Sequence, residues 1–153
     1  MFLYLLTHER ELTKKSNTGR LVVQSVPEYA KIITWKRKEP CPELIDKIAV
    51  GSTALLYPGE NSEPLEEGGQ FDSYILLDGT WQEAQKMYNK SSYLKTLPKV
   101  KITTDQISQY HMRRNQKEQG LCTAECAVEL LKHSKEPALA EKLTDNFELF
   151  LGF

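Results

Sequence analysis

The sequence has few cysteines and no long apolar run, and both absences limit what it can encode. Its three cysteines, Cys41, Cys122 and Cys126, are an odd number without a Cys-x-x-Cys pair, so buried thiols are expected and a zinc or redox pair is not. No apolar stretch approaches the roughly 20 residues that a membrane span needs. The opening Met1–Leu6 lacks the basic residues of a signal peptide. These absences predict a cytoplasmic protein.

Internal repeats and composition breaks are also missing, which predicts a single domain over residues 1–153. A content of 40% hydrophobic and 27% charged residues is typical of a globular chain. Apolar runs with the length of strands alternate with helical patterns, which predicts an α/β fold with a mostly parallel sheet and helices on both faces. The expected strands are Phe2–Thr7, Lys31–Trp35, Ala54–Tyr57, Tyr74–Leu77 and Lys99–Thr103.

Helices are expected near residues 40–48, 80–89 and 124–132, where Thr123 is the expected N-cap, and from Pro137 onward. In the last helix one apolar stripe should dock on the core; it comprises Leu139, Leu143, Phe147, Phe150 and Leu151. Leu21–Val26 is ambiguous, because its valines favour a strand while the preceding Asn17 and Thr18 favour a capped short helix, which we expect. The composition of Glu60–Gln70 predicts a surface loop without core residues.

The stretch from Phe71 to Met87 combines a strand, an acid, a turn and a helix. The apolar strand stops at Asp78, and Thr80 followed by Glu83 forms a capping box that should start a helix. Ligands of open α/β sheets bind at the carboxyl ends of strands, and a helix start offers N–H groups to an anion. Asp78 and this helix start are therefore a candidate site. The alternatives are that Asp78 is a turn acid and that Trp81 is a core residue.

Charge is unevenly distributed although the net charge is −1. Residues 86–117, which we call the basic segment, contain eight lysines and arginines and one acid, Asp105, so their net charge is 8 − 1 = +7. Aromatic and amide side chains such as Tyr88, Tyr93 and Tyr110 interleave with these charges. This pattern favours binding to a polyanion, while a solvated charged face is the alternative.

Four spaced motifs resemble the DTW-domain family. Its Asp-x-Thr-Trp motif stands at Asp78–Trp81, and an Asn-Thr-Gly-Arg motif stands at Asn17–Arg20. The family's His-x-x-Glu and its Tyr-x-x-Arg with a later Thr-x-Glu correspond to His8, Glu11, Tyr110, Arg113, Thr123 and Glu125. The resemblance extends from His8 to about Leu131, which is nearly the whole chain.

The resemblance implies a tRNA-uridine aminocarboxypropyltransferase, which moves the 3-amino-3-carboxypropyl group of S-adenosylmethionine to N3 of a uridine and releases methylthioadenosine. It also implies kinship with SPOUT-type methyltransferases, so that a trefoil knot can be expected toward the C-terminus near the cofactor. Many relatives begin with a cysteine cluster that this sequence lacks, so no metal is expected. Gln85, Cys122 and Glu9 depart from the residues common in the family, which are Arg, Ser and Pro.

Roles for individual residues follow from the motifs and from the chemistry. A carboxylate near the uridine N3–H can accept its proton, and Asp78 is the candidate base. The expected cofactor-binding residues are Leu77, Gly79, Thr80, Trp81, Thr123 and Glu125. The expected RNA-contacting residues are His8, Glu11, Arg20, Arg113 and Arg114. For two of these a structural role is the alternative: His8 as a buried histidine and Arg20 in a local salt bridge.

Other functions remain open from sequence alone. A SPOUT-like RNA methyltransferase would use a similar pocket, and a non-catalytic RNA-binding module would keep the positive charge without using Asp78. Ribosomal RNA is an alternative substrate to tRNA. The sequence leaves open whether the chain acts as a monomer or a homodimer.

Overall fold

A six-stranded sheet forms the centre of the computed structural model, which describes residues 1–103 and 121–152. The strand order is β2-β1-β5-β3-β6-β4, and each pairing between these strands is parallel. The predicted α/β class with a parallel sheet is therefore confirmed. The strands are β1 (Phe2–Thr7), β2 (Ala30–Thr34), β3 (Thr53–Leu56), β4 (Glu63–Pro64), β5 (Ser73–Asp78) and β6 (Lys99–Lys101).

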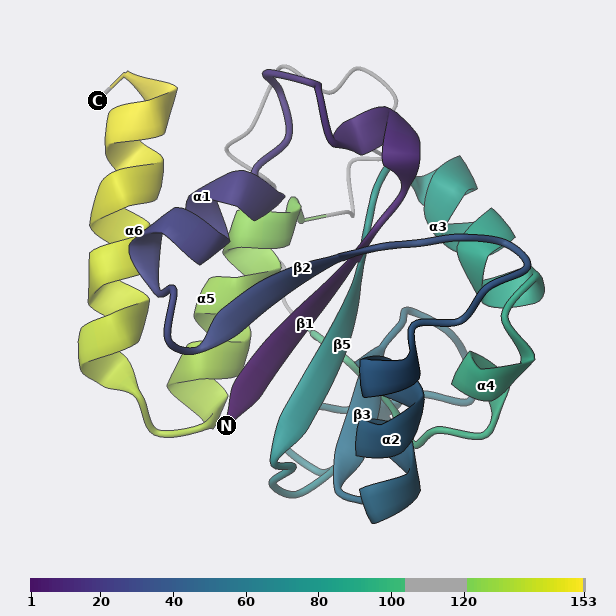
Figure 1. Ribbon diagram of the computed structural model, residues 1–153. Helices are drawn as coiled ribbons and strands as arrows, with labels where there is room; N and C mark the ends of the chain where they lie inside the picture. The colour runs from purple at the N-terminus through teal and green to yellow at the C-terminus, as the bar shows by residue number, and fades with distance from the viewer. Residues whose placement is uncertain (104–120, 153) are drawn as a thin grey trace.

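Helices cover both faces of this sheet, as predicted (Figure 1). One face carries α1 (Gly19–Ser25), α5 (Thr123–His133) and α6 (Pro137–Leu151). The other face carries α2 (Pro42–Val50), α3 (Trp81–Asn89) and α4 (Ser92–Lys95), and a short 3-10 turn, η1 (Glu9–Glu11), follows β1. Within the described residues, no helix has both the length and the apolarity to cross a bilayer.

Two hydrophobic cores lie on the opposite faces of the sheet because side chains alternate along each strand. In β1, Leu3 and Leu5 pack against α1, α5 and α6, whereas Tyr4 and Leu6 pack under α2, α3 and α4. A strand buried on both faces has a continuous apolar sequence, which is why Phe2–Thr7 shows no polar alternation. The central strands are thus held rigidly in place.

The connections leave β1 and β5 in opposite directions. β1 leads through α1 to β2 on one side, and β5 leads through α3 and α4 to β6 on the other side and over the other face (Figure 1). Ligand crevices of open α/β sheets form where the chain diverges in this way, beyond the carboxyl ends of the two strands. This topology therefore predicts a ligand site beside the last residues of β1 and β5, Thr7 and Asp78.

The ambiguous segment at residues 21–26 is helical, which confirms the expectation. α1 runs over Gly19–Ser25 with Thr18 at its N-cap, and Val22 is fully buried. Its valines face the core shared with α5 and α6, so tertiary packing outweighs their strand propensity.

The expectation of a coreless loop at Glu60–Gln70 is wrong. Glu63 and Pro64 form the edge strand β4 beside β6, and Leu65 is only 5% exposed within the hydrophobic core. The Leu65 N–H donates to the carbonyl oxygen of Lys101 over 2.8 Å. A proline is compatible with an edge strand, where no partner needs its missing N–H. The single-turn helix α4 was likewise not predicted.

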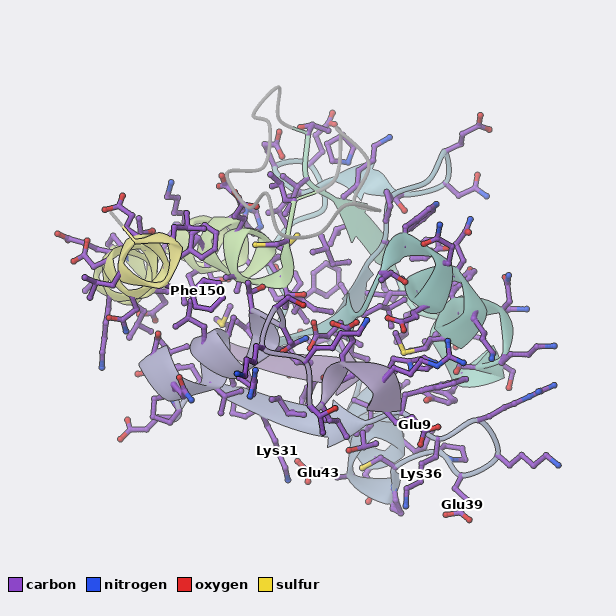
Figure 2. The ribbon with its side chains drawn as sticks, turned by 90° about the horizontal axis from the view of Figure 1, so that it is seen from above. Glu9, Lys31, Lys36, Glu39, Glu43 and Phe150 are labelled. Carbon is purple, nitrogen blue, oxygen red and sulfur yellow. The ribbon has the colours of Figure 1, made fainter. Side chains whose placement is uncertain are left out.

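The last helix packs by the predicted stripe for most of its length. Leu143 and Phe147 are buried, and Leu139 and Leu151 pack partly against the same core. Phe150, labelled in Figure 2, is 38% exposed, although the stripe predicted it inward. The predictions for Tyr110, Arg113, Arg114 and the rest of 104–120 lie outside the described residues, and the trefoil knot stays a prediction.

Candidate functional site

Asp78 is the last residue of β5 and lies at the carboxyl end of the sheet. It pairs in register with Thr7, the last residue of β1, and it is 1% exposed. The strand ends at this acid, and the chain then turns at Gly79 into α3. The candidate site at this position is therefore built on two neighbouring interior strands of the sheet, β1 and β5.

Donors from three other segments surround the Asp78 carboxylate. The hydroxyl of Thr7 donates to Oδ2 over 3.1 Å, and the hydroxyl of Thr123 donates to Oδ1 over 2.8 Å. The side-chain amide nitrogen of Asn17 lies 3.0 Å from both oxygens. We call Thr7, Asn17, Asp78 and Thr123 the Asp78 cluster. It links β1, β5 and the starts of α1 and α5.

Burial raises the pKa of Asp78 because removal from water disfavours the charged form. The hydrogen bonds from Asn17, Thr123 and Thr7 act in the opposite direction, and the nearby Glu11 carboxylate raises the pKa further. The net direction is upward. A carboxylate with a raised pKa is a stronger base than an exposed aspartate, which suits proton transfer.

Glu11 is a second buried carboxylate beside this cluster. It is fully buried, and its Oε1 accepts from the Asn17 amide over 3.2 Å while its Oε2 lies 2.8 Å from the Lys14 ammonium. The amide of Asn17 thus bridges two carboxylates, Glu11 and Asp78. The predicted contact of Glu11 with RNA stays a prediction, and the contacts seen are internal.

The start of α3 has the predicted capping box. Thr80 Oγ1 accepts from the Glu83 N–H over 3.2 Å, and Glu83 Oε1 accepts from the Thr80 N–H over 2.8 Å. A helix start leaves several N–H groups without partners inside the helix, and the box occupies two of them. In the part of the chain that the structure describes, the backbone N–H groups of Trp81 and Gln82 have no acceptor. These two residues follow Asp78 by three and four positions.

The start of α5 differs from the prediction in one respect. Cys122 is the N-cap, and its N–H donates to Glu125 over 2.9 Å, so Thr123 is the first helical residue instead of the cap. The hydroxyl of Thr123 is directed to Asp78, which explains why it does not cap. The Ala124 N–H donates to Thr18 Oγ1 over 3.0 Å and ties α5 to α1.

His8 is buried, at 5% exposure, and has structural contacts. Its Nδ1 accepts from the Arg10 N–H over 3.2 Å, and its ring stacks on Trp35 with centroids 5.7 Å apart. Glu83 Oε2 lies 3.8 Å from the same Nδ1. These contacts match the alternative of a structural histidine, and its role toward RNA stays a prediction.

Arg20 and Trp81 are both partly exposed. Arg20 donates to the backbone carbonyl of Lys14, which differs from the local salt bridge considered as its alternative. Trp81 lies at the first position of α3 and packs on Tyr57, with ring centroids 5.7 Å apart. It is therefore partly accessible at the start of α3, and Leu77 is also partly exposed.

The three cysteines differ in environment. Cys122 is 3% exposed, and burial raises its pKa to about 12, so its thiol stays protonated and unreactive at neutral pH. Cys41 and Cys126 are half-buried, which corrects the expectation that all three are buried. Across residues 1–103 and 121–152, no group of three or more His, Cys, Asp and Glu side chains is arranged to hold a metal.

Sequence reasoning missed two members of the cluster, Thr7 and Asn17, as functional residues. Asn17 belongs to the Asn-Thr-Gly-Arg motif, which was a detectable signal, whereas Thr7 is an ordinary strand residue. Its role follows from its register opposite Asp78, which only the pairing of β1 with β5 establishes.

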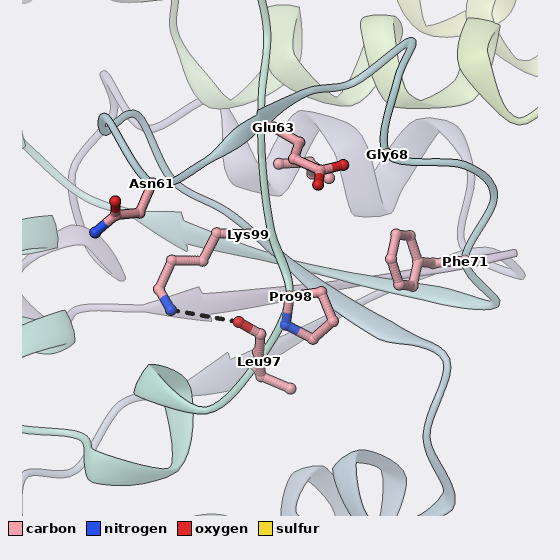
Figure 3. Close-up of a pocket in the computed structure, with 8 residues that line it drawn as sticks. Asn61, Glu63, Gly68, Phe71, Leu97, Pro98 and Lys99 are labelled. Carbon is pink, nitrogen blue, oxygen red and sulfur yellow. Dashed lines mark hydrogen bonds between the residues drawn. The ribbon is translucent and has the colours of Figure 1, made fainter.

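One surface pocket of about 420 Å³ lies elsewhere, at the β6 and β4 edge of the sheet (Figure 3). Its lining includes Glu63, Phe71, Pro98 and Lys99, and it shares no residue with the Asp78 cluster. We therefore base the candidate site on the cluster and on the strand ends.

Gly19 is required for the approach of α1 to Asp78. A Cβ atom there would collide with Asp78 Oδ2 and lie 3.0 Å from Asn17 Oδ1. We expect Gly19→Ala to lower the free energy of unfolding by about 1–3 kcal/mol, as overpacking does in other interiors. Chemical denaturation measures this loss.

Gly59→Ala is the matched control, because the nearest atom to a Cβ there, Ser62 Oγ, is 3.8 Å away. Its unfolding free energy should stay within about 0.5 kcal/mol of the wild type. Equal effects of the two substitutions would contradict the steric account.

Comparison with known proteins agrees with the motifs. The DTW domain matches residues 1–153. The chain is 31% identical over 134 residues to tRNA-uridine aminocarboxypropyltransferase 2 of Macaca fascicularis, an alignment that covers 82% of this chain and 45% of that protein. The protein of the same name in Drosophila melanogaster is 32% identical over 139 residues, which cover 83% of this chain and 53% of that protein. The Mus musculus protein of this name is 30% identical over 134 residues, which cover 82% of this chain and 45% of that protein.

The chain thus spans about half the length of these curated relatives. No solved structure shows significant similarity to it. With the motif segments of β1, α1, β5 and α5 gathered around one buried carboxylate and the domain matched from end to end, the chain belongs to the DTW-domain family.

Proposed function

We propose that this protein transfers the 3-amino-3-carboxypropyl group of S-adenosylmethionine to N3 of a uridine in tRNA. The observation that carries the proposal is the convergence of separated motif segments on Asp78 in a chain whose relatives are named for that activity. The name of the relatives also supports tRNA as the substrate instead of ribosomal RNA.

The donor is expected to bind at the start of α3. The N–H groups of Trp81 and Gln82 suit the methionine carboxylate, since a helix N-terminus favours an anion. Trp81, partly exposed beside them, suits the adenine or the thioether. Leu77, Gly79 and Thr80 shape the strand-to-helix turn on which these groups sit. The chemistry of these groups fits the donor.

The reaction needs a proton acceptor and a fixed direction of attack. Uridine N3 loses its proton and attacks the methylene carbon next to the sulfonium, the carbon–sulfur bond breaks, and its electron pair stays on sulfur in methylthioadenosine. The pocket must expose the longer arm of the donor and cover its methyl group, because both carbons are electrophilic. Asp78 is the proposed base.

The path from uridine to this buried base passes through Thr123 in our proposal. Asp78 is 1% exposed, whereas Thr123 is partly exposed and already donates its hydroxyl proton to Oδ1 over 2.8 Å. Thr123 would pass that proton to Asp78 and take the proton of N3–H in its place. The buried carboxylate then acts without direct contact with the uridine ring.

Asp78→Asn should abolish transfer while the donor still binds. A general base contributes on the order of 10²–10⁴-fold, so methylthioadenosine release should fall by at least about 100-fold. Calorimetric titration with S-adenosylmethionine and thermal unfolding should show a folded protein that binds the donor. Near-normal turnover in this variant would remove Asp78 as the base.

In the wild type, the same assignment sets the pH dependence. The base must be ionised, and its pKa is raised by burial, so kcat/KM should increase with pH through a value above the ordinary aspartate pKa of about 3.9. This rise should be missing from any residual activity of Asp78→Asn.

Thr123 offers a sharper pair of variants. Thr123→Val removes the hydroxyl with little change in shape and should lower kcat by about 10-fold or more, whereas Thr123→Ser keeps the hydroxyl and should retain most of it. Single-turnover measurement at saturating donor separates this effect from binding. A Val variant as active as the Ser variant would show that the proton takes another route.

Product analysis tests the function against its alternatives. S-adenosylhomocysteine in place of methylthioadenosine would identify a methyltransferase, and a lack of heat with S-adenosylmethionine would identify a non-catalytic RNA-binding module. Mass spectrometry of tRNA nucleosides from cells without the protein should show the loss of an aminocarboxypropyl uridine.

Binding of tRNA should weaken steeply with salt. The basic segment carries a net charge of +7, and each phosphate contact releases condensed counterions. If six or more phosphates are contacted, raising the salt from about 50 to 200 mM should lower the tRNA affinity by orders of magnitude. Filter binding measures this decrease. A flat response would exclude the basic segment as the contact surface.

A further inference from the structure

Three aromatic rings pack together beside the candidate site. Tyr57 directly follows β3, and Trp81 and Tyr88 lie seven residues apart, two turns along one side of α3. The ring of Tyr57 stacks on Tyr88 with centroids 4.4 Å apart and an interplanar angle of 22°. The Tyr57 ring also packs on Trp81, with centroids 5.7 Å apart. All three rings are partly exposed.

Two lysines lie next to the Tyr88 ring of this group. The ammonium groups of Lys95 and Lys99 lie 6.0 and 5.5 Å from the centroid of the Tyr88 ring, which is cation–π range. Lys99 also donates to the carbonyl oxygen of Lys95 and to that of Leu97, a hydrogen bond that Figure 3 shows. No carboxylate of the described residues pairs with either lysine. Their charge is thus available to an anion.

The sheet register brings these residues together. Lys99 pairs with Leu55, so both lie on the face covered by α3 and α4, and Tyr57 comes two residues after Leu55 on the same face. Short α4 brings Lys95 alongside. We call Tyr57, Trp81, Tyr88, Lys95 and Lys99 the aromatic–lysine surface. One end of it is the start of α3, three residues after Asp78, and the other end is cationic.

The composition of this surface fits single-stranded RNA. Partly exposed aromatic rings give nucleobases a surface on which to stack, which is worth about 1–3 kcal/mol per base, and adjacent ammonium groups attract the phosphates. An acidic peptide would use the lysines but would leave the rings without a role. To reach Asp78, a uridine must leave the stack of bases in its RNA loop. The bases on either side of it then lose a stacking partner and can stack on protein aromatic rings instead.

We propose that the aromatic–lysine surface binds the single-stranded RNA next to the modified uridine, with a flanking base against the Tyr57–Tyr88 pair and its phosphate at Lys95 and Lys99. This inference rests on the proposed function for the identity of the reaction. The binding it describes needs no donor and no turnover. It can therefore fail or succeed separately from the transferase assignment.

The first test measures the affinity of a fluorescently labelled short oligouridylate for the full chain without donor. Tyr88→Leu should weaken binding by about fivefold or more, whereas Tyr88→Phe, which keeps the ring, should stay within about twofold. Thermal unfolding and donor calorimetry should be alike in both variants. Equal affinities of the Leu and Phe variants would overturn the stacking role.

The lysines are tested by charge removal. The double variant Lys95→Gln with Lys99→Gln should weaken binding and make the slope of log K against log salt shallower by about 0.7 to 1, because the one phosphate placed at these lysines is no longer neutralised. Lys132→Gln with Lys142→Gln, at exposed positions on α5 and α6, should leave the slope unchanged. The same slope in both double variants would overturn the proposal.

A crosslinking measurement avoids substitutions altogether. Irradiation of the wild-type complex with an oligonucleotide that contains 5-iodouridine should attach RNA to peptides that contain Tyr57 or Tyr88. Crosslinks that map to neither peptide would overturn the inference. If these crosslinks form but no methylthioadenosine is released with tRNA and S-adenosylmethionine, the transferase assignment fails and the RNA surface stands.

Discussion

The hydrogen bonds that converge on the carboxylate of Asp78 are the constraint on which the rest of the site depends. Thr7, Asn17 and Thr123 reach it from β1, from the turn before α1 and from the start of α5. A buried carboxylate without such donors would cost several kcal/mol or take up a proton. The Asp78 carboxylate thus orients the three donor side chains, and their hydrogen bonds offset the free-energy cost of burying its charge.

This mutual dependence determines how closely the surrounding elements approach. α1 can reach the carboxylate only through a glycine, since Gly19 leaves no room for a side chain. Asn17 joins Asp78 to the second buried acid, Glu11, whose other oxygen is near Lys14. The hydrogen bond from the Ala124 N–H to Thr18 then ties α5 to α1. These residues therefore form one connected polar cluster at the carboxyl ends of β1 and β5.

Along α3 the surface has two different characters. The start of the helix, beside Asp78, offers N–H groups and a partly exposed indole, which suit a small anionic and apolar donor. Two turns further on, stacked tyrosines and neighbouring lysines suit bases and phosphates. Trp81 belongs to both regions. A donor and a nucleic acid bound in this way would meet near the carboxyl end of β5, where the proposed base lies.

The sequence by itself determined the α/β class, the buried central strands and the capping box of α3, because each depends on local pattern and spacing, and the same kind of pattern predicted Asp78 as the centre of the candidate site. It misassigned the cap of α5, where the hydroxyl of Thr123 is taken by an aspartate 45 positions away. It also missed Leu65 and β4, whose burial comes from pairing with β6. Only the tertiary structure decided that Thr7 faces Asp78 and that Tyr57, Tyr88 and Lys99 lie together. Strand order and register set those contacts between residues far apart in the chain, and no local preference encodes them.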